Sequence, residues 1–327
     1  TYRWVAYTLV VANGSGSGGY SMGTQIPITA NGPGAGRMFS HWEGDAVNVA
    51  DVTDATTIFT MPDGNAHISA VYKSEADAVL YVWAGATGAN DGSCWTDAYT
   101  DPQDAIDNAP DGAQVWVARG VYTPGAWPNG GSGARERHFS LKNGVEVYGG
   151  FLGTEFRVDQ RDPAANPTIF SGDCNGDDLW TDNWGEAPTS QIGRIVQDGV
   201  VNYPIKGFVP DQLSQPENCY HVFYHPASLA LDKTAILDGV VVTGGCANAN
   251  PGGTYETGNM GGGMFNEGCS PSVRNTSFVG NHAVWSGAAI YNRNGCAPIF
   301  DCCAVVGNRV SYYGSAIFNE VSAVMYL

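Results

Sequence analysis

Apolar and polar residues alternate along the first quarter of the chain, in short runs that end at turn-forming residues. Examples are YTLVVANG at 7–14, TQIPITANG at 24–32 and TTIFTMPDG at 56–64. This alternation predicts strands that bury one face, because successive side chains of a strand point to opposite sides. Residues 1–74 are therefore expected to form a small all-β module, followed by a short polar linker at 75–78.

A second pattern repeats near the other end of the sequence. The letters GGGMFN at 261–266 recur as GAAIYN at 287–292 and as GSAIFN at 314–319, a period of 26 to 27 residues. A looser copy of the unit is AILDGVVVTGG at 235–245. A fixed period of this size indicates a solenoid, because each unit buries its apolar face only against its neighbours.

The residue types inside each repeat indicate which solenoid to expect. Short β-type runs are cut by Gly, Asn, Pro and Ser, and neither helical periodicity nor a dense leucine pattern is present. Three short strands and three turns fit into one repeat. The fold class is therefore expected to be all-β, with a parallel β-helix over residues 79–327 behind the small module.

Asparagines recur at equivalent positions of the repeats. Asn266, Asn292 and Asn319 form one column, and Asn281 and Asn308 form another. We expect these amides to stack in neighbouring coils and to hydrogen-bond to one another and to turn backbone. The columns are therefore interpreted as structural rather than catalytic.

A short helix is expected near the start of the larger region, within residues 95–112. Ala105, Ile106 and Ala109 give it one apolar stripe, and the Asp-Gly pair at 111–112 is expected to end it. This helix would cap the first coil of the β-helix.

Two resemblances extend these expectations. The segment 7–73, with Phe39, Trp42, Gly44, Asp45 and the turn FTMPDGNA, resembles the divergent bacterial repeat module related to internalin-type B-repeats. Such modules are small all-β spacers of secreted and surface proteins. The resemblance implies the same role here, with Trp42 filling the core of a small sheet rather than binding a sugar.

Residues 79–327 resemble the secreted right-handed β-helix proteins of bacteria, within the pectin-lyase-like superfamily. The segments that carry the resemblance include YVWAGATGANDGSCW, VYGGFLGTE, RDPAANPTIFSGD, NCYHVF and LDGVVVTGG. The resemblance implies a right-handed parallel β-helix. It implies no particular reaction, because one fold serves many functions.

Composition and charge favour an exported protein. The chain of 327 residues has 15 Lys and Arg against 32 Asp and Glu, which gives a formal net charge of −17. Like-charge repulsion excludes nucleic acid and anionic membrane surfaces as partners. Eight cysteines without a CxxC pair suit an oxidising compartment, so we expect a secreted, extracellular cell-surface location. No apolar run is long enough for membrane insertion, and no signal peptide opens the chain, so residue 1 is expected to be a mature or trimmed start.

The repeats offer no catalytic constellation. Lyases of this superfamily use a Lys or Arg base beside calcium-binding carboxylates, but Arg274, Arg293 and Arg309 stand beside few carboxylates in the sequence. Lys233 with Asp232 and Asp238 is the nearest candidate, and a solvated turn explains it better. His221 and His225 have helical spacing in a segment that reads as strand, which disfavours a metal pair.

The longest break in the repeat pattern, residues 173–218, holds the candidate ligand-binding residues. Asp173, Asn175, Asp177 and Asp178 place oxygen atoms around a glycine, as at the start of a calcium loop, but the distal Glu of an EF-hand is missing. The alternative is an acidic solvated loop. Trp180 and Trp184, in the same break, are candidates for carbohydrate binding by stacking, or for a lid on the β-helix.

Two cysteines occupy equivalent positions of successive repeats. Cys269 and Cys296 are 27 residues apart, so their Cα atoms should be one strand spacing apart, roughly 4.8 Å. That spacing permits a disulfide, and free stacked thiols are the alternative. The pairing of the other candidates stays open: Cys94, Cys174, Cys219 and Cys246.

Two classes of function follow. The first is a non-catalytic structural or adhesive surface protein that self-assembles through its ends, where strand edges can pair with copies of the chain. Further coils after residue 327 are the favoured cover for that edge, so the β-helix is expected to be incomplete at its C-terminal end, and a neighbouring copy is the alternative cover. The second class is a carbohydrate-active β-helix, either a polysaccharide lyase or a glycan-binding scaffold. Calcium is the only cofactor suggested, and polysaccharide is the partner of the second class.

Overall fold

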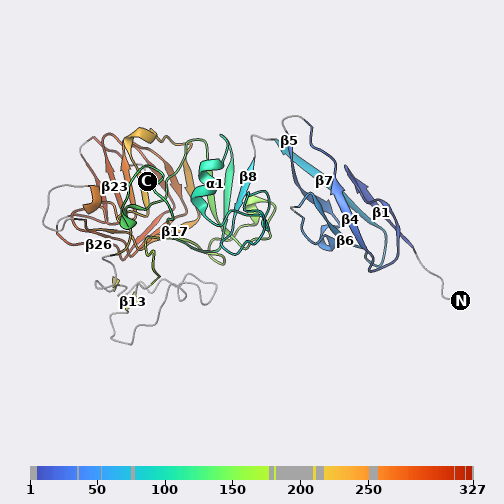
Figure 1. Cartoon of the computed structure of the whole chain (residues 1–327). Coiled ribbons are helices and arrows are strands. Elements are labelled where there is room, and N and C mark those ends of the chain that lie inside the picture. Colours follow the sequence, from blue (N-terminus) through green and yellow to red (C-terminus); the bar gives the residue numbers. More distant parts are fainter. Residues whose placement is uncertain are drawn as a thin grey trace. The chain divides into compact units, whose positions relative to one another are not determined.

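The chain divides into two compact units, Thr1–Ala78 and Val79–Leu327, which are described separately. Figure 1 shows the computed structural model. The structure describes residues 6–34, 37–52, 54–74, 78–176, 180–181, 209–210, 217–249, 257–312, 314–320 and 322–325.

The first unit consists of two small sheets. Its strands are β1 (Tyr7–Ala12), β2 (Gly14–Ser15), β3 (Gly18–Tyr20), β4 (Gln25–Ala30), β5 (Arg37–Gly44), β6 (Thr56–Thr60) and β7 (Ala66–Ser74), with one 3-10 turn, η1 (Ala46–Asn48). One sheet has the order β3-β1-β7-β5 and the other β2-β4-β6. All neighbours are antiparallel except β1 and β7, which are parallel. The expected all-β module is confirmed.

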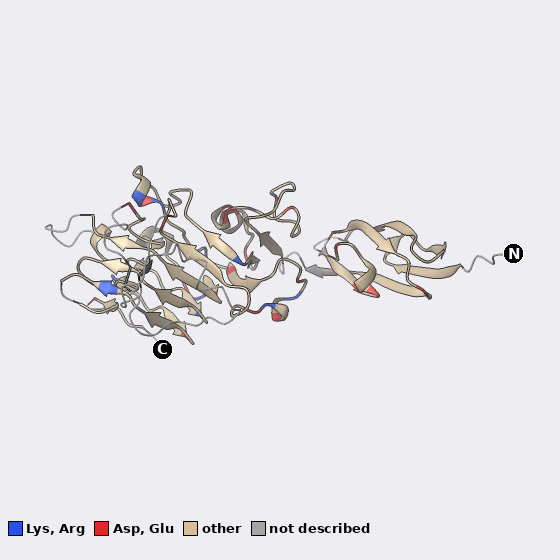
Figure 2. Cartoon of the chain, turned by 90° about the horizontal axis from the view of Figure 1, so that it is seen from below, with Lys and Arg blue, Asp and Glu red and all other residues tan. Residues whose placement is uncertain are grey.

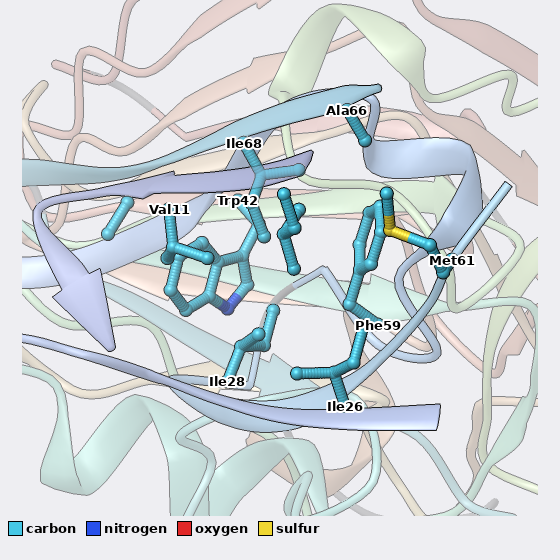
Figure 3. Close-up of a cluster of buried hydrophobic side chains, with 10 residues drawn as sticks. Val11, Ile26, Ile28, Trp42, Phe59, Met61, Ala66 and Ile68 are labelled. Atoms are coloured by element: carbon cyan, nitrogen blue, oxygen red, sulfur yellow. The ribbon is translucent and has the colours of Figure 1, made fainter. Parts of the chain in front are cut away.

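The alternating strands bury their apolar faces around one indole. Leu9, Ile28, Trp42, Phe59 and Ile68 are all fully buried, and Figure 3 shows Trp42 between side chains of several strands. The indole Nε1 donates a hydrogen bond to the carbonyl oxygen of Asp54 at 3.0 Å, so its polar atom is satisfied inside the core. The expectation that Trp42 fills this core is confirmed.

The Gly44-Asp45 pair closes the end of β5. Gly44 has φ of +100°, and an added Cβ would lie 2.4 Å from the carbonyl oxygen of His67, so a larger residue cannot fit without displacing the backbone. The Asp45 carboxylate then accepts a hydrogen bond from the His67 backbone N–H at 2.7 Å. This part of the motif therefore fixes the register of β5 against β7.

The second unit is built mainly from short parallel strands. They are β8 (Val79–Val82), β9 (Gln114–Ala118), β10 (Gly120–Tyr122), β11 (Glu146–Phe151), β12 (Thr168–Ser171), β13 (Trp180–Thr181), β14 (Val209–Pro210), β15 (Phe223–His225), β16 (Ile236–Asp238), β17 (Val240–Thr243), β18 (Cys246–Ala247), β19 (Met264–Glu267), β20 (Ser272–Arg274), β21 (Ser277–Val279), β22 (His282–Ala283), β23 (Ile290–Arg293), β24 (Ile299–Asp301), β25 (Ala304–Val306), β26 (Arg309–Val310) and β27 (Ile317–Asn319). The described helical elements are α1 (Pro102–Asn108) and the 3-10 turns η3 (Ala134–Glu136), η4 (Val158–Gln160), η6 (Ala227–Leu229) and η7 (Thr257–Asn259).

Four parallel sheets collect strands from successive repeats. Their orders are β24-β20-β16-β11-β9-β8, β10-β12-β17-β21-β25, β15-β19-β23-β27 and β18-β22-β26. The chain passes through β19, β20, β21 and β22, one in each sheet, and then returns to the sheet of β19 with β23. Each repeat therefore contributes four strands. The expectation of three strands was wrong, because His282–Ala283 forms an additional two-residue strand between β18 and β26.

Register follows the repeat read from the sequence. Phe265 pairs with Tyr291, and Tyr291 pairs with Phe318, so the three six-letter segments lie directly side by side. The looser copy also aligns: β16 pairs with β20 and β17 with β21. The repeat interpretation is confirmed at both places.

Helix α1 packs against β8 and β9, at the edge where the second unit begins. The Asp101 side chain caps it by accepting a hydrogen bond from the backbone N–H of Gln103 at 2.8 Å, and Pro102 is its first residue. Ala105 and Ile106 are buried, as expected from the apolar stripe. The helix ends at Asn108, before the Asp-Gly pair that was expected to end it, because Ala109 already has extended backbone.

Candidate functional site

The main polar feature of the second unit is a column of asparagines in the sheet β15-β19-β23-β27. The Asn266 Nδ2 donates to the Asn292 Oδ1 at 2.8 Å, and the Asn292 Nδ2 donates to the Asn319 Oδ1 at 2.7 Å. Asn266 and Asn292 are fully buried. Buried amides need such partners, since an unpaired polar group costs free energy in a packed interior. The expected asparagine column is confirmed.

A histidine extends this column by one further strand. His225 pairs in register with Asn266, and its Nδ1 lies 2.7 Å from the Asn266 Oδ1. The backbone N–H of Leu141 donates to the His225 Nε2 at 3.2 Å, so the ring proton is on Nδ1 and is donated to Asn266. Burial lowers the pKa of His225 to about 4, which keeps the ring neutral at ordinary pH. We call His225, Asn266, Asn292 and Asn319 the amide column.

The second asparagine pair forms a shorter column at another corner of the repeat. The Asn281 Nδ2 donates to the Asn308 Oδ1 at 2.9 Å, and the Asn281 Oδ1 accepts from the Gly245 backbone N–H at 3.0 Å. The Asn308 Nδ2 in turn donates to the carbonyl oxygen of Phe278 at 2.8 Å. These amides hydrogen-bond to each other and to the backbone of the turns, as expected from the sequence.

Stacked aromatic rings accompany the amide column. The Phe265 and Tyr291 ring centroids are 5.3 Å apart with planes 17° from parallel, and the Tyr291 and Phe318 centroids are 5.4 Å apart with planes 9° from parallel. Phe265 and Tyr291 are fully buried. The rings fill space between repeats and expose no face to a ligand at these two positions.

The two histidines with helical spacing do not share a ligand. His221 is buried, and its Nδ1 lies 2.9 Å from the carbonyl oxygen of Gly261, whereas His225 belongs to the amide column. Burial lowers the pKa of His221 to about 4. Among the residues that the structure describes, no group of three or more His, Cys, Asp or Glu side chains is placed to hold a metal ion.

The carboxylate considered as a catalytic candidate is held by an arginine. Asp238 is buried, and its Oδ1 accepts a hydrogen bond from the Arg161 Nη2 at 2.7 Å. The Arg161 guanidinium also lies over the ring of Tyr148, 4.8 Å from its centroid. Asp232, in contrast, is exposed and accepts from the backbone N–H of Thr234 at 2.8 Å, as in a solvated turn. The sequence favoured a solvated turn over a catalytic group of Lys233, Asp232 and Asp238, and in the structure Asp238 is paired with Arg161.

Part of the predicted calcium loop lies outside the described residues. Asp173 is buried, and its Oδ1 accepts the backbone N–H of Gly176 at 2.7 Å, while Asn175 is exposed. Asp177 and Asp178 are outside the described residues, so calcium binding stays a prediction.

The predicted sugar-binding tryptophans lie in the same segment. Trp180 begins β13, which pairs with β14 in an antiparallel ribbon, and its side chain is outside the described part of the structure. Trp184 is also outside it. Carbohydrate binding at these residues stays a prediction.

The predicted bridge between Cys269 and Cys296 stays a prediction, and the structure holds both residues in the thiol state. Cys269 and Cys296 are both free and fully buried. The Cys269 Sγ donates to the carbonyl oxygen of Pro226 at 3.3 Å, and the Cys296 Sγ donates to that of Arg293 at 2.8 Å. Burial raises the pKa of the Cys269 thiol to about 11. Each thiol thus has a carbonyl partner in the unbridged state.

Charge is distributed rather than concentrated. Figure 2 shows Asp and Glu scattered over both units, largely in the segments between strands. Within the described residues, the structure contains no helix long and apolar enough to cross a membrane.

Comparison with known proteins supports the assignment of the first unit. A family model described as a divergent InlB B-repeat domain matches residues 7–76, so the resemblance stated for this module is confirmed. Neither the comparison with curated proteins nor that with solved structures gave a significant match. The second unit is therefore characterised by its own geometry.

Proposed function

We propose that the second unit is a right-handed parallel β-helix and that the chain is a non-catalytic structural or adhesive protein of the bacterial cell surface. One circuit through four parallel sheets in each repeat supports the β-helix. Its right-handedness follows from the strong preference of parallel strand connections for that hand. The B-repeat match at residues 7–76 and the net charge of −17 support an extracellular location.

The observation that carries this proposal is the use of polar side chains in the repeats. Three consecutive hydrogen bonds join His225, Asn266, Asn292 and Asn319 across four neighbouring strands. These groups satisfy one another and hold the repeats in register, so they are not available for catalysis. Such an arrangement suits a scaffold whose neighbouring repeats keep a fixed spacing.

Two arginines of the second unit are paired with carboxylates. The Arg293 guanidinium forms an ion pair with Glu267 at 2.9 Å and lies over the Phe265 ring, 4.9 Å from its centroid. Arg161 is held by Asp238. A lyase needs a Lys or Arg base that reaches substrate, together with carboxylates that hold calcium. Because both arginines are already paired with carboxylates, they support a structural role rather than lyase activity.

We further propose that the chain associates with copies of itself through strand edges. Among the strands that the structure describes, β24, β25, β26 and β27 stand at the edges of their sheets, and β25 and β27 are less buried than their neighbours β21 and β23. Edge strands present unpaired backbone groups that can accept a further strand. A second copy that adds a rung here would form a head-to-tail contact, which can continue into a filament.

Light scattering of the purified 327-residue chain over a range of concentrations tests the assembly. The proposal predicts particles whose mass grows with concentration and filaments in electron micrographs. A monomer at every concentration would remove the self-association part.

A single substitution at the edge strand sharpens this experiment. The Ala304 N–H and the Val306 carbonyl both bond toward the inner strand, so the Val305 N–H faces the open edge. Val305→Pro removes that outer donor and leaves the inner hydrogen bonds in place. We expect a lower assembled mass, and a retained thermal transition shows that the variant folds. The exposed Val47→Ala serves as control.

A further inference from the structure

We propose that Cys174 and Cys219 form a disulfide that joins the two ends of the 175–218 segment. Their Sγ atoms are 3.0 Å apart. A disulfide has a sulfur–sulfur length of about 2.05 Å, so the sulfurs need to approach by only about 1 Å. Both cysteines are free in the structure, which therefore represents the dithiol state.

The backbone on the Cys219 side is fixed by the parallel strands. The Cys219 N–H donates to the carbonyl oxygen of Gly172 at 2.9 Å, and the Cys219 carbonyl accepts from the Cys246 N–H at 2.8 Å. The adjacent Asn218 donates from Nδ2 to the carbonyl of Gly244 at 2.8 Å, and its own carbonyl accepts from the Arg135 Nε at 2.6 Å. This cysteine therefore has a defined position on the body of the unit.

The Cys174 side is also held in place. It follows the buried Asp173, whose backbone N–H donates to the Ser171 Oγ at 3.2 Å and whose Oδ1 accepts the Gly176 N–H at 2.7 Å. Both sulfurs are thus carried by backbone that is anchored to the sheets. Such preorganisation limits the strain that closing the bond would add.

The two thiols have complementary roles in forming the bond. Cys174 is exposed, whereas Cys219 is fully buried. Hydrogen bonding from Cys219 and the nearby positive charge of Arg137 lower the pKa of the Cys174 thiol, and the same hydrogen bond and burial raise the pKa of Cys219. Cys174 is therefore the accessible nucleophile, and Cys219 is the resolving thiol beside it.

The oxidant is a low-molecular-weight disulfide of the glutathione class. The Cys174 thiolate attacks one sulfur of that disulfide, which forms a mixed disulfide and releases one thiol. The Cys219 thiolate then attacks the Cys174 sulfur, which forms the protein disulfide and releases the second thiol. The two protein thiols lose two electrons and two protons, and the oxidant gains them as its two thiols.

The sequence permits a direct mass measurement. Trypsin cleavage after Arg161 and Arg194 gives peptide 162–194, which contains Cys174 as its one cysteine, and cleavage after Lys206 and Lys233 gives peptide 207–233, which contains only Cys219. The full chain is reduced, exchanged into oxidised glutathione, alkylated and digested without further reduction. We expect the two peptides to be joined. Recovery of both in alkylated form, or of either joined to another cysteine peptide, overturns the proposal.

A thermal measurement provides a second readout. Closing so long a loop restricts the unfolded chain, so the oxidised protein should melt roughly 5–10 °C above the reduced protein. Cys174→Ser should abolish both the linked peptides and this shift. Cys302→Ser, at an exposed cysteine elsewhere in the unit, should retain both. A shift that persists in Cys174→Ser contradicts the proposed pairing.

Discussion

The two units bury their side chains in different ways. In the first, strands of two small sheets converge on one central side chain, the fully buried Trp42. In the second, equivalent residues of successive repeats stack on one another, as Phe265, Tyr291 and Phe318 do. When a core converges on one residue, its stability depends strongly on that residue. A stacked core divides its stability among interfaces between neighbouring repeats.

The largest expected effect concerns the centre of the first unit. Trp42→Ala removes a buried indole and its hydrogen bond to Asp54, which should destabilise the first unit by about 3–5 kcal/mol. Chemical unfolding that resolves the two units should show the loss in the first unit alone. Val47→Ala, at a side chain that is 93% exposed, should change little. Equal destabilisation of both units would contradict the proposed difference between the two cores.

The next effect concerns the middle of the amide column. Asn292→Ala leaves the buried Asn266 Nδ2 without its acceptor and the Asn319 Oδ1 without its donor. The expected cost is about 2–3 kcal/mol, because a buried group that loses its partner keeps its desolvation penalty. Asn108→Ala is the control, since Asn108 is exposed, lies outside the column and donates to the carbonyl oxygen of Asp104 at the exposed end of α1, so its removal should cost less than about 1 kcal/mol. Equal costs at the two positions would contradict a register set by the buried amides.

The smallest of these effects is a dependence on pH. Burial lowers the pKa of His225 to about 4, below the value of about 6.5 in an unfolded chain, so the unfolded state takes up a proton first. The stability contributed by neutral His225 is complete above pH 6.5 and falls as the pH decreases toward 4. Between pH 6.5 and 5 the loss is about 2 kcal/mol.

The substitution His225→Asn isolates this contribution. Position 225 pairs in register with Asn266, so a new amide there can donate to the Asn266 Oδ1 without titrating. Urea unfolding at several pH values should show a shallower loss of stability in the variant between pH 6.5 and 5. An unchanged slope would show that His225 does not couple the column to pH.

Periodicity predicted much of this arrangement. The 26 to 27-residue spacing placed Asn266, Asn292 and Asn319 in one column, and the structure joins them by hydrogen bonds. Alternation predicted the core of the first unit for the same reason, since a fixed geometric period maps directly onto which side chains face inward.

Interactions between residues outside the repeat could not be predicted in this way. His225 lies 41 residues before Asn266, so the insertion between them hides their equivalence. Arg161 reaches Asp238 across 77 residues, and no local pattern signals that contact. Equal spacing of Cys269 and Cys296 indicated their repeat positions but not the hydrogen-bond partners of their thiols, which are different carbonyls. Side-chain direction depends on local turns that the period does not specify.

We propose a structural, non-catalytic role for the chain. Its most direct test is incubation with polygalacturonate and with alginate, with and without added calcium, followed by ultraviolet absorbance of the unsaturated product. A structural role predicts no increase over buffer for either polysaccharide. An absorbance increase proportional to protein concentration would contradict it and would identify the chain as a polysaccharide lyase.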